Sequence, residues 1–213
     1  MSKTKESISK IVKFFREIVV IVIGVAITLS ASYFITKISE KKDMYLYLNA
    51  IKMELEENIG FFEEEVLFLE DWENYAHYLS SRDKKLLHTD SIRRWGYSGL
   101  GTIHNVTFQT SAFEMFKVSG AMRLINDKEL LQSLWKSYIR LENSKIALDS
   151  YYQLKKEECI KSNQLELAGK SDPIPLYDFF YSYAGFGALD VCKGSLQGLK
   201  ETVEKLEKTL KNM

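Results

Sequence analysis

The sequence predicts an all-α protein, with a single N-terminal transmembrane helix followed by an elongated antiparallel bundle of long helices. Three observations lead to this fold class. The 213 residues contain only two prolines and 11 glycines, so few positions interrupt a helix. Apolar residues recur at spacings of three and four over long stretches, as they do on one face of a helix. One stretch near the N-terminus carries no charge for 19 residues.

The charge-free stretch runs from Ile18 to Thr36, between Glu17 and Lys37. As a helix it would span roughly 28 Å, close to the hydrocarbon thickness of a bilayer. Three interpretations are open: a retained membrane anchor, a cleaved signal peptide, or a helix buried in a soluble core. A core helix would usually show a polar stripe, and this stretch shows no charge anywhere. The apolar run also continues past the small residues 30–32, where a signal peptide would be cut, which favours a retained anchor.

Basic residues on the N-terminal side predict the orientation. Residues 1–17 form a short tail with five Lys and Arg, so we expect it in the cytoplasm and residues 38–213 outside the bacterial inner membrane. The lipid bilayer is then the partner of residues 18–36. Small residues recur every fourth position on this helix, which permits close packing of a second helix or is merely tolerated. This face consists of Gly24, Thr28 and Ser32.

Beyond the membrane the pattern predicts a soluble α-helical domain with helices at about 38–80, 110–119, 127–168 and 188–212. The short helix is expected to begin with a capping box from Ser111 to Glu114. The last helix has the regular spacing of a packed coiled coil. On the first helix we expect one apolar face, formed by Met44, Leu48, Ile51, Leu55, Ile59, Phe62, Val66 and Leu69. The opposite, solvated face is formed by Glu54, Glu56, Glu57, Glu63, Glu64 and Glu65.

The similar lengths of the 38–80 and 127–168 helices predict that the second returns along the first. The turn at 169–187 would then lie near the bilayer. It is rich in aromatic side chains, which favour the lipid headgroup region, although such a cluster can also simply close the end of a bundle. The members of this interfacial aromatic tip are Tyr177, Phe179, Phe180 and Tyr181.

Cys159 and Cys192 both lie on apolar seams, at equal distances from the middle of the same turn. Residues equidistant from the turn of an antiparallel hairpin face each other, so a disulfide can form in an oxidising compartment. Two free buried thiols are the alternative.

Motifs for catalysis, metal binding or cofactor binding are not found. The three histidines, His77, His88 and His104, are scattered, and no group of residues has metal-ligand spacing. The chain has no nucleophile motif and no Gly-rich phosphate loop. We therefore assign no catalytic, metal or cofactor-binding residues and expect no cofactor. The net charge of zero disfavours nucleic acid as a partner.

Two segments carry a family pattern. Glu17 to Leu29 reads EIVVIVIGVAITL, and Ser111 to Tyr138 joins a helix ending in Ser-Gly to Leu-Ile, an acidic cap and a new helix. In both, the chain resembles a bacterial domain-of-unknown-function family of single-pass membrane proteins. It departs from that family after Leu29, where SASYFITKISEKK replaces amide-rich, Trp-containing sequence. The resemblance implies an uncleaved anchor and an α-helical domain, and it implies no activity.

The sequence therefore favours a membrane-anchored, non-enzymatic helical protein of the bacterial envelope. We expect a scaffold or accessory subunit that acts through a protein partner or through self-association. One alternative is a ligand-sensing bundle, in which a small molecule binds between helices and shifts their packing. A third class is an enzyme with a site assembled in residues 81–138.

Overall fold

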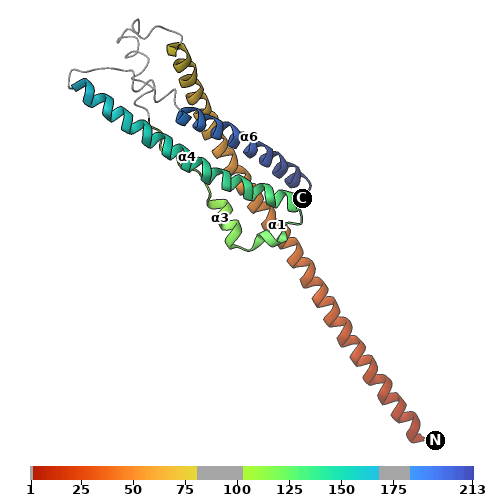
Figure 1. Ribbon diagram of the computed structural model, residues 1–213. Helices are drawn as coiled ribbons and strands as arrows, with labels where there is room; N and C mark the ends of the chain where they lie inside the picture. The colour runs from red at the N-terminus through yellow and green to blue at the C-terminus, as the bar shows by residue number, and fades with distance from the viewer. Residues whose placement is uncertain (1, 81–102, 168–182) are drawn as a thin grey trace. The chain divides into compact units, whose positions relative to one another are not determined.

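The computed structural model of the protein describes residues 2–80, 103–167 and 183–213, without the side chains of 2–15, 72, 74–80, 159, 162–167 and 183–186. All regular structure in these residues is helical, which confirms the all-α class (Figure 1). The elements are α1 (Ser2–Ser80), α3 (Ser111–Val118), the 3₁₀ helix η2 (Ala121–Leu124), α4 (Lys128–Leu167) and α6 (Tyr183–Lys211). Helix α1 joins the predicted membrane helix and the predicted 38–80 helix without a break.

The chain divides into two compact units, residues 1–46 (unit 1) and 47–213 (unit 2). In unit 1 the large apolar side chains between Ile18 and Ile35 are exposed, and none of the most apolar window is buried within the chain. This helix is long and apolar enough to cross a membrane. Within the residues that the structure describes, nothing buries this helix, which disfavours its interpretation as a core helix.

In unit 2, helices α4 and α6 lie side by side and run antiparallel. The Ser137 hydroxyl donates to Thr202 Oγ1 at 2.9 Å, and the Ser144 and Ser195 hydroxyls are 2.7 Å apart. Residue numbers thus rise along α4 as they fall along α6. Figure 1 shows the same arrangement, with the C-terminal end of α6 beside the start of α4.

Helix α6 also runs antiparallel to the part of α1 that belongs to unit 2. Ion pairs join the two helices along their length, and in each successive pair the residue number rises on α1 and falls on α6. The pairs are Lys52–Glu207 (3.2 Å), Glu63–Lys200 (2.7 Å) and Glu70–Lys193 (2.7 Å).

Helices α1 and α4 run parallel, so the expected return of the 127–168 helix along the first helix is wrong. Tyr138 of α4 is hydrogen-bonded to Glu54 of α1, and Tyr152 of α4 to Glu65 of α1. The residue numbers of the partners thus rise along both helices in the same direction. Residues 104–112, which precede α4, instead run back along α1. His104 contacts Glu65, and Ala112, eight positions later, contacts Glu54, which comes earlier in α1. The arrangement is therefore not a purely antiparallel bundle.

The parallel path of α4 also affects the predicted aromatic tip. Tyr177, Phe179, Phe180 and Tyr181 themselves lie outside the described residues. Their expected place at the bilayer required α4 to return along α1. Helix α4 instead ends on the same side of unit 2 as α1 does (Figure 1). Contact of these four residues with lipid stays a prediction.

The core of unit 2 follows three seams in which buried residues alternate spacings of three and four. This is the pattern of helices that pack side by side at small crossing angles. The α1 seam is Leu48, Ile51, Leu55, Asn58, Phe62, Glu65 and Leu69. The α4 seam is Leu130, Leu134, Ser137, Leu141, Ser144, Leu148, Tyr151 and Lys155. The α6 seam is Ala188, Cys192, Ser195, Leu199, Thr202 and Leu206.

Candidate functional site

Three buried polar side chains of α1 face either the start of α3 or residues 103–110, which we call the strap. The strap has no regular secondary structure and leads directly into α3. Glu54, Asn58 and Glu65 are only 7%, 2% and 1% exposed. Burial of such groups is costly unless they are hydrogen-bonded, so their partners define what the site does.

Glu54 caps the N-terminus of α3. One carboxylate oxygen accepts the Ala112 N–H at 2.6 Å and the other accepts the Phe113 N–H at 3.3 Å. The first N–H groups of a helix have no intrahelical partner, and the helix dipole favours a negative charge there. The Tyr138 hydroxyl donates to the same carboxylate. Glu54 thereby ties α3 and α4 to α1.

The predicted capping box of α3 does not form. Its N-cap residue, Thr110, makes no side-chain capping hydrogen bond. Glu114 instead pairs with Lys117 at 2.5 Å. The capping role passes to Glu54, which lies 58 positions before Ala112 in the chain.

Asn58 fixes the register of the strap. Its side-chain amide donates to the Gln109 carbonyl at 2.8 Å, and its carbonyl oxygen accepts the Gln109 N–H at 2.9 Å. This pair of bonds replaces the pairing that a neighbouring strand would provide. From the other side, Lys145 of α4 donates to the Val106 carbonyl at 2.9 Å.

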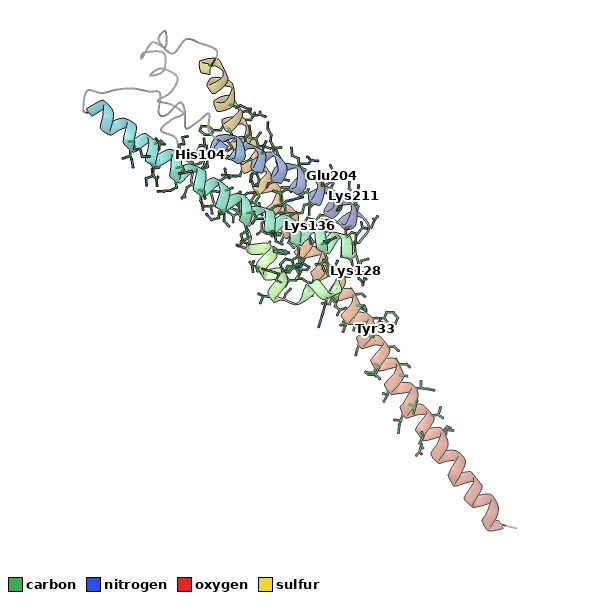
Figure 2. The ribbon with its side chains drawn as sticks, in the orientation of Figure 1. Tyr33, His104, Lys128, Lys136, Glu204 and Lys211 are labelled. Atoms are coloured by element: carbon green, nitrogen blue, oxygen red, sulfur yellow. The ribbon has the colours of Figure 1, made fainter. Side chains whose placement is uncertain are left out.

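Glu65 holds the start of the strap. Its carboxylate lies 2.7 Å from His104 Nδ1 and accepts the Tyr152 hydroxyl. The His104 ring packs on Phe68 and Tyr152, with centroid separations of 4.7 and 5.6 Å. Figure 2 labels His104 within this part of unit 2.

Tyr138, Tyr152 and Cys192, which lie close to these carboxylates, are held protonated. Burial raises the pKa of Tyr138 and Tyr152 well above the usual value, and the hydrogen bonds to Glu54 and Glu65 raise it further. Burial, with a smaller contribution from Glu65, raises the pKa of the Cys192 thiol to about 12. Near neutral pH the two tyrosines therefore act as hydrogen-bond donors, and Cys192 stays a thiol rather than a nucleophilic thiolate.

Lys155 completes this cluster as a fully buried cation of the α4 seam. Its ammonium group lies 4.9 Å from the Phe68 ring centroid and 5.6 Å from that of Tyr152. Contacts of this kind stabilise a cation over the negative face of an aromatic ring. Lys155 is therefore part of the core, although lysine is a residue type that usually lies at the surface.

The other predicted site residues fall in different places. In unit 1 the Thr28 hydroxyl donates to the Gly24 carbonyl at 2.9 Å, and both residues are exposed with Ser32, so that face is open to a neighbour. Helix packing on it stays a prediction. Cys192 is buried in the α6 seam, but the Cys159 side chain lies outside the described residues, and the disulfide also stays a prediction. The described side chains contain no group of three or more His, Cys, Asp or Glu able to hold a metal ion.

The predicted solvated position of Glu54 and Glu65 is wrong, because both side chains are buried. Ile59 and Val66, which were predicted on the apolar face, are only half-buried. A signal was present in the spacing. A strict alternation of three and four that begins at Leu48 continues through Asn58 and Glu65, and so predicts two polar residues in the core.

Comparisons of the chain with protein-family models, with curated proteins and with solved structures gave no match. The resemblance to the bacterial family of single-pass membrane proteins therefore stays a prediction.

Proposed function

We propose that the chain is a single-pass membrane protein of the bacterial envelope that acts by protein–protein contacts, as a scaffold or accessory subunit. The observation that carries this proposal is the exposed apolar surface of residues 18–36, which none of the described residues covers. Unit 2 has a core of its own, so it does not need that surface to fold. A bilayer is the environment that would cover such a helix.

The buried polar groups of unit 2 support a role as a scaffold. Glu54, Asn58 and Glu65 are engaged in holding the strap and α3 in place. Fully partnered buried networks of this kind favour one rigid arrangement. A rigid surface on a membrane anchor suits a subunit that positions other proteins.

The orientation belongs to the same proposal. The basic tail at 1–17 lies in the cytoplasm, and residues 38–213 lie in the periplasm or outside the cell. Protease added to intact spheroplasts should then degrade unit 2 and leave the tail protected. Protection of unit 2 in intact spheroplasts, with its loss after lysis, would reverse the orientation.

Co-purification tests the contact role. The full chain, extracted from native membranes with a mild detergent, should bring a protein partner at a near-constant ratio measured by quantitative mass spectrometry. The control is residues 1–46 fused to an inert soluble domain, which keeps the anchor and should lose the partner. A chain that elutes alone as a monomer, and whose melting temperature rises by several degrees with a small metabolite, would support a ligand sensor instead.

A further inference from the structure

The outer face of α1 in unit 2 carries a second row of residues with alternating spacings of three and four. Its members are Ala50, Met53, Glu57, Gly60, Glu64, Leu67 and Asp71. Unlike the core seam, this row faces outward: Met53 and Leu67 are 57% and 65% exposed. A Cβ added at Gly60 would meet nothing within 4 Å, so the middle of the row is also open. We call this set the outer row.

Six acidic residues of this part of α1 form three doublets of neighbours at 56–57, 63–64 and 70–71, each seven positions after the last. The first member of every doublet, Glu56, Glu63 or Glu70, pairs with a lysine at 2.7–3.2 Å. For Glu63 and Glu70 that lysine comes from α6. The second members belong to the outer row and make no ion pair with any residue that the structure describes; they are Glu57, Glu64 and Asp71.

The α1–α6 contact shows which partner this kind of surface accepts. Along α6, Lys193 and Lys200 are seven positions apart and meet Glu70 and Glu63 of the antiparallel α1. Buried apolar residues of both helices lie beside these pairs. In the outer row the carboxylates of Glu57, Glu64 and Asp71 also recur every seven positions, one residue after the paired glutamates. Met53 lies before them and Leu67 between them, two heptads apart, with Gly60 midway. Charge complementarity therefore calls for a second helix with lysine or arginine at intervals of seven.

We propose that the outer row is the docking surface for a helix of another protein, one that presents apolar residues at heptad spacing with Lys or Arg between them. This inference rests on the proposed function and specifies the chemistry of the partner. From Met53 to Asp71 the row is about 27 Å long, which a helix of about 18 residues matches. Gly60, which has no side chain, allows close approach at the centre.

A second copy of the chain is a poor occupant of this surface. In a two-fold symmetric contact each copy presents the same patch to the other. Two outer rows packed on each other would bring the carboxylates of Glu57, Glu64 and Asp71 against their own counterparts. Like charges in such positions destabilise helix pairs, whereas a basic helix neutralises them.

A synthetic helix tests the proposal directly. The probe is a fluorescein-labelled peptide of about 25 residues, with Leu at heptad-spaced positions and Lys between them. Its partner is the full chain in phosphatidylcholine nanodiscs, with empty nanodiscs as the blank and binding read by fluorescence anisotropy. The control peptide has every Lys replaced by Glu. The basic peptide should bind, more weakly at higher salt because the charges are exposed, and the acidic peptide should not.

Variants of the chain assign the binding to the outer row. Glu57→Lys/Glu64→Lys/Asp71→Lys should weaken binding of the basic peptide by at least about tenfold and should create binding of the acidic peptide. If the charge-reversed variant fails to fold, the neutral variant Glu57→Gln/Glu64→Gln/Asp71→Asn replaces it. This variant should weaken binding of the basic peptide by about threefold to tenfold. The matched control is Glu142→Lys/Asp190→Lys/Glu204→Lys, which changes exposed carboxylates of α4 and α6 by the same total charge and should change binding less than twofold; Figure 2 labels Glu204.

Four results would overturn the inference. One is equal binding of the basic and acidic peptides, or none of either. The second is an equal loss in the outer-row and control variants. The third is a dimer, measured by light scattering, that dissociates only in the outer-row variant, because the occupant would then be a second copy. A natural partner that still co-purifies with the outer-row variant would overturn this inference and leave the proposed function intact.

Discussion

Replacing Glu54 with alanine should destabilise unit 2 by about 3 kcal/mol. The substitution removes the acceptor of the Ala112 and Phe113 N–H groups, and loss of a helix cap costs about 1 kcal/mol. It also leaves the buried Tyr138 hydroxyl without its carboxylate acceptor, which costs a further ~1–3 kcal/mol. Because α3 leads from the strap toward α4, the loss should first appear as fraying of α3.

Two measurements on the full chain in detergent micelles follow this change. Urea unfolding monitored by circular dichroism gives the loss of stability. Hydrogen exchange followed by mass spectrometry should show faster exchange in the first turn of α3. The control is Glu57→Ala, a glutamate of the same helix that is exposed, for which we expect a change within about 0.5 kcal/mol.

A double substitution separates the two contributions. Tyr138→Phe alone should cost about 1 kcal/mol, because it leaves the cap of α3 in place. Glu54→Ala combined with Tyr138→Phe should cost less than the sum of the single changes, since the two side chains share one hydrogen bond. If Glu54→Ala costs no more than Glu57→Ala and leaves exchange in α3 unchanged, the capping role of Glu54 is refuted.

Further predictions concern the strap and the core. Asn58→Ala should cost about 1–2 kcal/mol and speed amide exchange at Gln109, whereas unchanged exchange there would show that Asn58 does not hold the strap. Tyr152→Phe should cost about 1–3 kcal/mol, because buried Glu65 loses a donor; a neutral effect in urea unfolding would contradict this. The raised pKa of Cys192, about 12, predicts stability that is complete below about pH 8.5 and is lost as pH rises, because only the unfolded state then releases the thiol proton. Under reducing conditions the free energy of unfolding should fall by up to about 1.4 kcal/mol per pH unit above pH 9. Cys192→Ala should flatten this slope between about pH 9 and 10. An unchanged slope in that variant would show that the Cys192 thiol does not cause the loss of stability.

The helices could be predicted from the sequence because their signals are local. Few residues break a helix, and the spacing of apolar residues places α4 (Lys128–Leu167) close to the predicted 127–168. The direction of α4 could not be predicted in the same way. The direction of α4 depends on the strap, which precedes α4 in the chain and runs back along α1. The contacts that hold the strap, such as that of Gln109 with Asn58, join residues 51 positions apart.

The candidate site was hidden for a related reason. A glutamate next to other glutamates reads as solvated, and only its partners show otherwise. For Glu65 these partners are His104 and Tyr152, 39 and 87 positions later. Each of them offsets part of the cost of burying the carboxylate, so burial depends on tertiary contacts that no local pattern reports. The heptad register was the one local signal that pointed to Glu65.

Retention of the apolar helix in the membrane is the central claim, and the intact mass of the mature chain tests it most directly. Membranes that contain the expressed chain would be washed with alkaline carbonate and the chain measured by mass spectrometry. We predict that the chain stays in the membrane pellet with a mass that includes residues 1–36. A chain released by carbonate, or one whose mass shows cleavage near residues 30–32, would contradict the claim and identify the apolar stretch as a signal peptide.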